Sequence, residues 1–236
     1  MKAVIHQPYY LPYPGHFHKI SMGEIFVIMD NTQYDKRFTN RNRIINPNGK
    51  KKWDWISVPI NKEDKFLANK DVKINNEISW REEHWKKITH TYSNSKFFHL
   101  YSDFFKENFQ REWEFLFDID FEFIKKLLEW LNIKVEIIKE SELNIKGTSS
   151  DRLVNICKSI GADTYISGIG GYNYINRNTF EKNEIKLVFQ KYNPIPYKQR
   201  FSEEFIPDLS IIDMLSNVGN ESSKLISEEF LQYNKV

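Results

Sequence analysis

The clearest pattern in the chain is a series of short apolar runs, each followed by a polar loop. The first run, 2–5, is rich in β-branched residues, and the second, 24–29, is continuously apolar, which is typical of strands buried on both faces. Prolines at positions 8, 12 and 14 keep the loop between these runs out of a long helix. Similar runs predict further strands at 53–60, 135–138, 164–167 and 185–189.

Apolar residues at helical spacing fill the stretches between several of these runs. Helices are expected at 79–92, 97–113, 115–131 and 148–160, the last one closed by Gly161, and a short helix at 15–23. Strands that alternate with helices favour an α/β fold with a mostly parallel central sheet and flanking helices, Rossmann-like in its order of elements. No linker composition divides the chain, so we expect a single domain over 1–236, with the helical segment 79–131 as an insertion or subdomain.

Composition and charge exclude some classes of partner. The 34 basic and 32 acidic groups nearly cancel, so no overall field recruits DNA or an anionic membrane. No window approaches 18 apolar residues and no signal peptide opens the chain, so we expect a cytoplasmic protein without a membrane span. The single cysteine, Cys157, is expected to be a packed thiol.

Three polar segments follow predicted strands, and ligands of open parallel sheets bind beyond the carboxyl ends of the strands. The first segment runs from His6 to His18 and combines prolines with phenol, amide and imidazole groups. His6 is a candidate for orienting or deprotonating a nucleophile, and a phosphate could bind at the following helix start. The alternative is that the loop merely covers the sheet edge. The expected ligand contacts are Gln7, Tyr9 and Tyr10.

The two histidines at the end of this segment also suggest a metal. His16 and His18 with one intervening residue and no third ligand nearby are a weak zinc signal, so no metal site is expected.

The second segment, 30–43, carries Asp30 directly after a strand and three arginines within seven positions. Asp30 is the second candidate catalytic group. Arginines interleaved with asparagines suit bidentate binding of phosphate or carboxylate, although a solvated run of charges is the usual alternative. The expected ligand contacts are Gln33, Arg37, Asn40, Arg41, Asn42 and Arg43.

The third segment, 167–174, places glycines after a strand, where the backbone could approach a ligand closely. Its spacing does not fit the G-x-G-x-x-G dinucleotide fingerprint, and glycine loops after strands are common, so alone it is weak support. The expected contacts are Ser167, Gly168, Gly170, Gly171 and Tyr174.

An ordered set of short motifs resembles the WbqC-like family of bacterial polysaccharide-biosynthesis proteins, over roughly 2–219. The matching stretches are 7–12 with Gly15, 26–34, 40–44, 55–59, Trp80, 149–153, 165–174 and 205–213. Since that family is associated with gene clusters for O-antigen (lipopolysaccharide) and related surface glycans, the resemblance implies a role in making or modifying a sugar unit. His16 stands where the family generally has an aromatic residue, so it is not carried over as a shared catalytic group.

A second, weaker similarity concerns architecture alone. A strand, a proline-rich loop and Gly-His at a short helix look like the opening of the nucleotidylyl-transferase-like folds. Their H-x-G-H signature is absent, because Tyr13 stands at the place of the first histidine.

The leading hypothesis is a transferase that acylates or aminoacylates an amino group on a nucleotide-linked sugar in surface-polysaccharide biosynthesis. The cofactor is unknown and could be an acyl or aminoacyl donor; the partners are a sugar nucleotide and other glycan-biosynthesis enzymes. Two alternatives stay open: nucleotidylyl transfer, and a non-catalytic sugar-nucleotide-binding protein of a glycan assembly complex.

Overall fold

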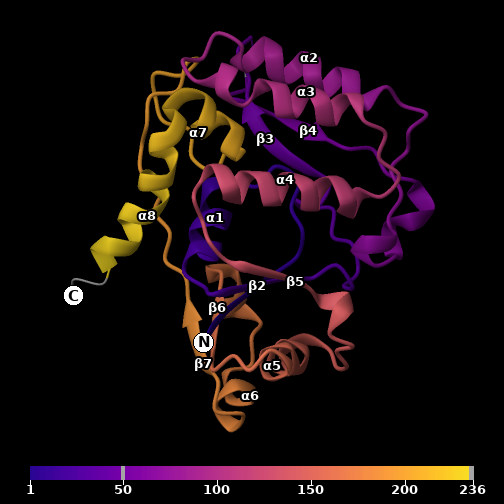
Figure 1. Ribbon diagram of the computed structural model, residues 1–236, viewed down its shortest axis with the longest axis vertical. Coiled ribbons are helices and arrows are strands. Elements are labelled where there is room, and N and C mark those ends of the chain that lie inside the picture. The colour runs from indigo at the N-terminus through magenta and orange to yellow at the C-terminus, as the bar shows by residue number, and fades with distance from the viewer. Residues whose placement is uncertain (49–50, 234–236) are drawn as a thin grey trace.

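Five strands form one parallel sheet in the lower half of the molecule (Figure 1). The structure is a computed structural model that describes residues 1–48 and 51–233. Across the sheet the order is β5-β2-β1-β6-β7, so that β1 is central and the winding reverses between β1 and β6. The strands are β1 (Lys2–His6), β2 (Ile25–Ile28), β5 (Glu136–Lys139), β6 (Thr164–Ser167) and β7 (Lys186–Phe189).

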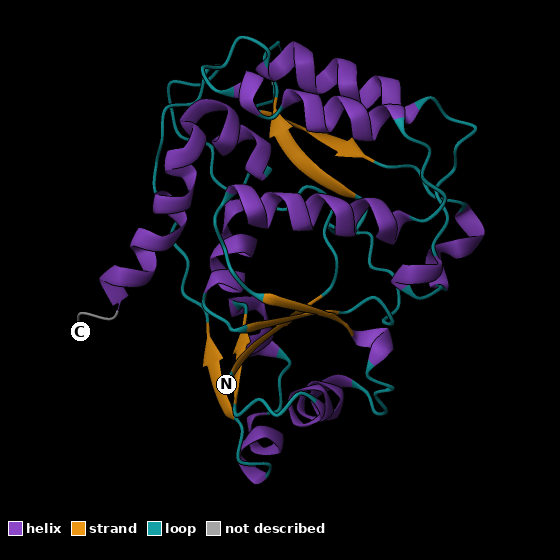
Figure 2. Ribbon diagram, in the orientation of Figure 1, coloured by secondary structure: helices purple, strands orange, loops and turns teal. Residues whose placement is uncertain are grey.

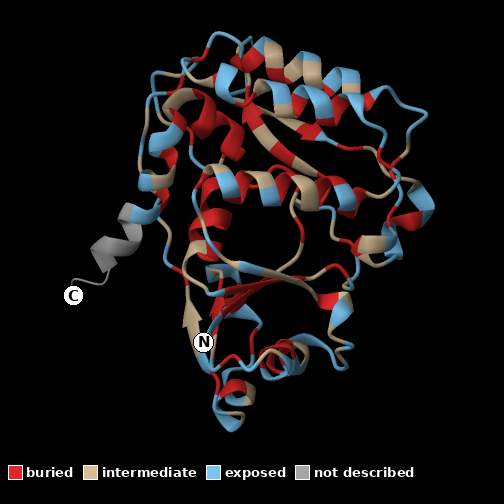
Figure 3. Ribbon diagram, viewed as in Figure 1, coloured by how far each residue is buried: buried red, intermediate tan, exposed pale blue. Residues whose placement is uncertain are grey.

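The central strands are buried on both faces (Figure 3). Because side chains alternate along a strand, β1 sends Val4 to one apolar cluster and Ala3 and Ile5 to another. In the same way, β2 sends Phe26 to the first cluster and Val27 to the second. Because both faces of these strands are buried, almost all of their residues are apolar.

Helices cover both faces of the sheet. Figure 1 shows α1 and α4 on one side and α5 and α6 on the other. The Val4 cluster includes apolar residues of α1 and α4, and the Ala3 cluster includes those of α5 and α6. Their bounds are α1 (Pro14–Ser21), α4 (Leu116–Trp130), α5 (Ser149–Ser159) and α6 (Arg177–Lys182).

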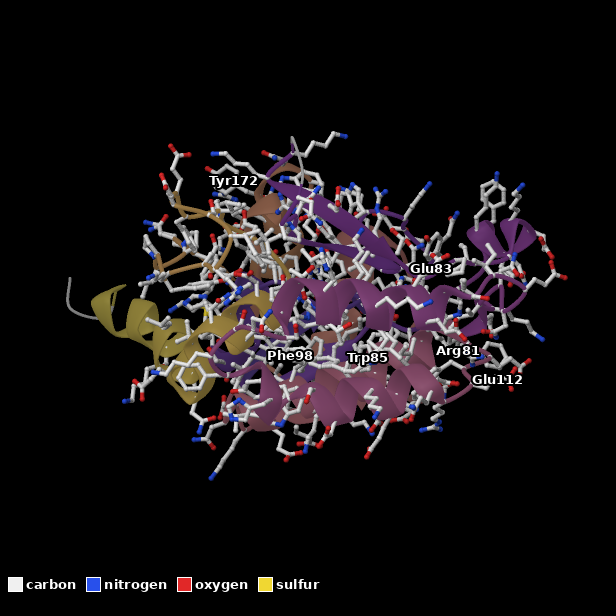
Figure 4. All side chains as sticks on the ribbon, turned by 90° about the horizontal axis from the view of Figure 1, so that it is seen from above. Arg81, Glu83, Trp85, Phe98, Glu112 and Tyr172 are labelled. Atoms are coloured by element: carbon white, nitrogen blue, oxygen red, sulfur yellow. The ribbon has the colours of Figure 1, made fainter. Side chains whose placement is uncertain are left out.

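The connection from β2 to β5 holds an additional layer. An antiparallel pair of strands, β3 (Arg41–Ile45) and β4 (Trp53–Ser57), lies apart from the parallel sheet (Figure 2). Above it α2 (Trp80–Tyr92) packs beside α3 (Ser102–Gln110), and Trp85 stacks on Phe98 between them (Figure 4). Short 3-10 turns complete the layer: η1 (Lys62–Phe66), η2 (Asn69–Asp71) and η3 (Phe98–Leu100).

The C-terminal part runs back along one side of the molecule (Figure 1). After β7 the chain runs without regular structure to α7 (Ile211–Val218) and α8 (Ser222–Tyr233). Buried Gln199 anchors this stretch, because it exchanges hydrogen bonds with the backbone of Ile206 and donates to Asp213 at 2.8 Å. The remaining 3-10 turns are η4 (Glu140–Glu142), η5 (Ile169–Asn173) and η6 (Gly219–Glu221).

The prediction of a mostly parallel sheet with helices on both faces is confirmed. Three details differ from the expectation. The strand at 53–57 belongs to the antiparallel pair, whose partner strand at 41–45 was not expected, and the helix expected at 97–113 is broken into η3 and α3. Helices α6, α7 and α8 were not predicted. Within residues 1–48 and 51–233, the helices are too short or too polar to cross a bilayer.

Candidate functional site

His6 ends β1, next to the point where the winding of the sheet reverses. It shares a strand face with Val4, so its ring points toward α1. Its Nδ1 lies 3.0 Å from the carbonyl oxygen of Gln7, which can only accept, so Nδ1 carries the proton and Nε2 has a free lone pair. Burial, and secondly the charge of Lys19, lower the pKa of His6 well below its ordinary value. The ring is therefore neutral at physiological pH.

Two aromatic rings enclose His6. Tyr9 meets it edge-on with ring centres 4.5 Å apart, and His16 does so at 4.9 Å. Tyr9 also stacks on His16 at 5.3 Å. Burial, followed by the charges of His6 and Lys19, lowers the pKa of His16, and its buried Nε2 has no hydrogen bond among the described residues.

Lys19 of α1 was not singled out from the sequence. It lies one turn after His16 on the same helix face and is 3% exposed. Burial lowers the pKa of its ammonium from 10.5 to about 7. The signal that could have revealed it is a lysine at i+3 from a histidine in a short helix without acidic residues.

The glycine segment adjoins Lys19 from β6. The Nζ atom of Lys19 lies 3.9 Å from the position that a Cβ on Gly168 would take. Gly171 is packed so closely that an added Cβ would collide with Oγ of Ser167, whereas Gly170 faces open space. Tyr174 follows at the rim and is 68% exposed. The first and third predicted segments thus meet at β1 and β6.

His18 points away from His16. Gln190, directly after β7, donates through Nε2 to the carbonyl of Gly15 and to Nδ1 of His18, both at 2.8 Å. His18 therefore accepts at Nδ1, and burial lowers its pKa to about 4. Across residues 1–48 and 51–233, no three His, Cys, Asp or Glu side chains gather as a metal site would require.

The second segment reaches the site through a row of aromatic rings. Tyr9 packs on Phe38 at 5.3 Å, Phe38 on Trp55 at 6.0 Å, and the Arg41 guanidinium lies 4.1 Å above Trp55. Burial first, with Tyr13, Asp35 and Tyr174 adding to it, raises the pKa of Tyr9, while the charge of Arg37 opposes the rise. Arg37 is exposed and paired with Asp35 at 2.8 Å. All three predicted segments therefore converge around Tyr9.

Other residues predicted in these segments hold the fold together. Tyr10 is fully buried and donates to Nδ1 of His84 at 2.8 Å, since His84 uses Nε2 to bond the carbonyl of Ser57. The buried Asn40 and Asn42 donate to backbone carbonyls, Asn40 to Val58. For these three we favour structural roles over ligand contact.

Arg43 and Gln33 are also apart from the central cluster. Arg43 donates to the carbonyl of Asp208 at 2.9 Å and lies over Trp53. Gln33 is exposed and its backbone bridges to Ala68. Their contact with a ligand stays a prediction.

Asp30, the second candidate catalytic group, lies two residues after the end of β2 and is 2% exposed. Both of its oxygens accept hydrogen bonds from Ser141, one from the amide at 2.8 Å and one from the hydroxyl at 2.5 Å. The neighbouring Glu140 forms a buried ion pair with Arg152 of α5. This geometry favours a role for Asp30 in tying β2 to the turn after β5, and its catalytic role stays a prediction.

Two surface hollows lie elsewhere on the molecule. One of about 250 Å³ is lined by the end of α1, by 131–134 and by α8, and one of about 590 Å³ is lined by 61–63 and 74–77. Neither is lined by a residue of the cluster around His6 and Lys19, which is defined here by its side-chain chemistry.

Comparison with known proteins assigns the chain to a family without assigning a reaction. It is 28% identical over 224 residues to the uncharacterized protein Rv1507c of Mycobacterium tuberculosis (strain ATCC 25618 / H37Rv), which covers 94% of this chain and 95% of that protein. No solved structure matches the chain significantly. The model of the WbqC-like protein family matches residues 7–225. The chain therefore belongs to the WbqC-like protein family.

Proposed function

We propose that this protein is a transferase that acylates or aminoacylates the amino group of a nucleotide-linked sugar in surface-polysaccharide biosynthesis. The observation that carries the proposal is the neutral His6 ring, with its Nε2 lone pair free, at the point where the winding of the sheet reverses. Ligands of doubly wound sheets bind at that point. The row of aromatic rings from Tyr9 to Trp55 supplies surfaces for a base or a sugar.

The proposed chemistry needs one proton acceptor. The sugar amine attacks the carbonyl carbon of an activated donor, a C–N bond forms, and the C–O or C–S bond to the leaving group breaks. Nε2 of His6 takes the proton from the attacking amine and returns it to the leaving group. A neutral imidazole suits this task, because a protonated ring could not accept.

The test is turnover with purified protein, candidate nucleotide-linked amino sugars, and acyl or aminoacyl donors. A product with the mass of the transferred group is expected, and His6→Gln should reduce its rate by roughly 10²- to 10⁴-fold, the usual contribution of a general base. His99→Gln, at an exposed histidine of η3, is the matched control. Sugar-nucleotide binding without product for any donor would favour the non-catalytic alternative.

Nucleotidylyl transfer is the second candidate. Two observations favour it: the strand order in which the first strand is central, and Gly15-His16 in the first turn of α1 after that strand. It predicts Mg²⁺-dependent release of pyrophosphate from a nucleoside triphosphate. Against it, Tyr13 replaces the first histidine of H-x-G-H, and the rings of Tyr13 and Tyr192 cover Gly15 at the helix start.

A further inference from the structure

Lys19 has no part in the transfer step and no evident part in stability. Its neighbours on α1, Phe17 and Ile20, are packed in the core, whereas the Lys19 side chain is 3% exposed and its ammonium lies beside Gly168. A buried charge without a partner costs free energy that a solvent-facing lysine avoids. A buried lysine beside two histidines is therefore a candidate ligand-binding group.

The groups around Lys19 point to an anion. The titratable groups whose charges act together with its own are His6 from β1 and His16 from α1, and neither is a carboxylate. On the neighbouring α8, Lys224 pairs with Glu221. From β6, Gly168 offers backbone without a side chain, so a ligand group can come close to the ammonium.

We propose that Lys19 binds the diphosphate of the nucleotide-linked substrate. The inference rests on the proposed function, since that function names a sugar nucleotide as ligand. The place agrees with the general rule for doubly wound sheets, because Lys19 and Gly168 flank the reversal between β1 and β6. Proton uptake follows because an adjacent dianion favours the charged amine.

The experiment is isothermal titration calorimetry of UDP-glucose at pH 8 in two buffers with different ionisation enthalpies. The diphosphate diester of this probe does not titrate near neutral pH, so proton uptake reports on the protein. With a free-site pKa of about 7 for Lys19, uptake of about 0.9 proton per bound ligand is expected. Inorganic sulfate is the second probe and separates a site for free anions from one that also recognises the nucleotide.

Two variants isolate the ammonium. Lys19→Met should weaken UDP-glucose binding by roughly 10- to 100-fold, the range for a lost charge-assisted hydrogen bond, and should abolish the proton uptake. Lys158→Met, at an exposed lysine of α5, should change neither. Equal affinity and uptake in Lys19→Met, or no binding of UDP-glucose by the wild-type protein, would overturn the inference.

The same measurements distinguish this inference from the proposed function. If the protein binds UDP-glucose with proton uptake but forms no product with any donor, the proposed transferase function is contradicted and the Lys19 site is supported. If Lys19→Met forms product with an unchanged KM for the sugar nucleotide, the Lys19 site is contradicted and the transferase function is supported.

Discussion

Nζ of Lys19 lies 3.9 Å from the place of a Cβ on Gly168, so position 168 decides how closely a ligand approaches this ammonium. The backbone at Gly168 has φ −67° and ψ 159°, which any residue adopts. A side chain there is therefore tolerated by the backbone but occupies the space beside the amine.

Gly168→Leu should consequently fold normally and lose UDP-glucose affinity by roughly tenfold or more, the order of one lost charge-assisted hydrogen bond. Ile169→Ala is the control, because Ile169 lies in the same loop and is 66% exposed. Calorimetric titration measures both. Equal losses in the two variants would point to a general disturbance of the loop and contradict a ligand at Lys19.

Lys19→Met should make the protein more stable while it loses ligand affinity. The pKa of Lys19 is about 7 in the folded state against an ordinary 10.5, so the unfolded state binds more protons between these values. Wild-type stability therefore rises with pH across this window. At pH 7 the variant should be more stable by about 4 kcal/mol, a difference that shrinks by about 1.4 kcal/mol per pH unit on going to pH 10.

Urea unfolding at several pH values measures this difference. A Lys19→Met protein that is less stable than the wild type at every pH would show that the amine stabilises the fold, and would contradict its assignment as a ligand group.

Asp120 of α4 should make stability fall as the pH rises. It is fully buried, neither oxygen has a hydrogen bond within the described residues, and burial raises its pKa well above 3.8. The folded state holds this proton more tightly than the unfolded state, so the contribution is lost as the pH rises from 3.8 through the folded pKa. In Asp120→Asn this fall should be absent, whereas Asp118→Asn, at an exposed position of the same helix, should keep it.

The Asp120 prediction is checked by the free energy of unfolding between pH 4 and pH 8. The difference between Asp120→Asn and wild type should grow in favour of the variant as the pH rises. A constant difference would mean that Asp120 has a partner that compensates its charge.

Asn42 should be required for the geometry of the proline loop. Its Nδ2 donates to the carbonyl of Leu11 at 2.9 Å, and Leu11 is held at φ 45°, which is unfavourable for a leucine. Asn42→Ala should cost roughly 1–3 kcal/mol, because buried carbonyls lose their donor. Thermal unfolding measures the loss, and Asn31→Ala, at an exposed asparagine in the loop after β2, should be nearly neutral. If Asn42→Ala is as stable as the wild type, Asn42 does not stabilise the proline loop.

The strands of the parallel sheet could be predicted from sequence because double burial demands almost continuous apolar runs. The strand at 41–45 could not, since one of its faces carries Arg41 and Arg43, whose guanidinium groups lie over Trp55 and Trp53 of the partner strand. Pairing between strands, rather than any local pattern, makes this segment extended. Because this pairing is not visible in the local sequence, the arginines were interpreted as a phosphate-binding or solvent-exposed run of charges.

The position of part of the candidate site was predicted from the sequence. His6 and Tyr9 were expected at the carboxyl end of the first strand, where ligands of open parallel sheets bind, and the structure places both there, while their roles stay predictions. Tyr10 was expected beside them, but the chain turns so that Tyr10 enters the core and contacts His84. Lys19 was not singled out, because its spacing from His16 marks a shared helix face, whereas its burial depends on tertiary packing.

A crystal structure of the protein with a bound UDP-sugar tests the central claim most directly. The account predicts the diphosphate within hydrogen-bond distance of Nζ of Lys19 and beside the Gly168 backbone, with the sugar toward His6. A diphosphate bound instead on Arg41 and Arg43, away from Lys19 and Gly168, would contradict it.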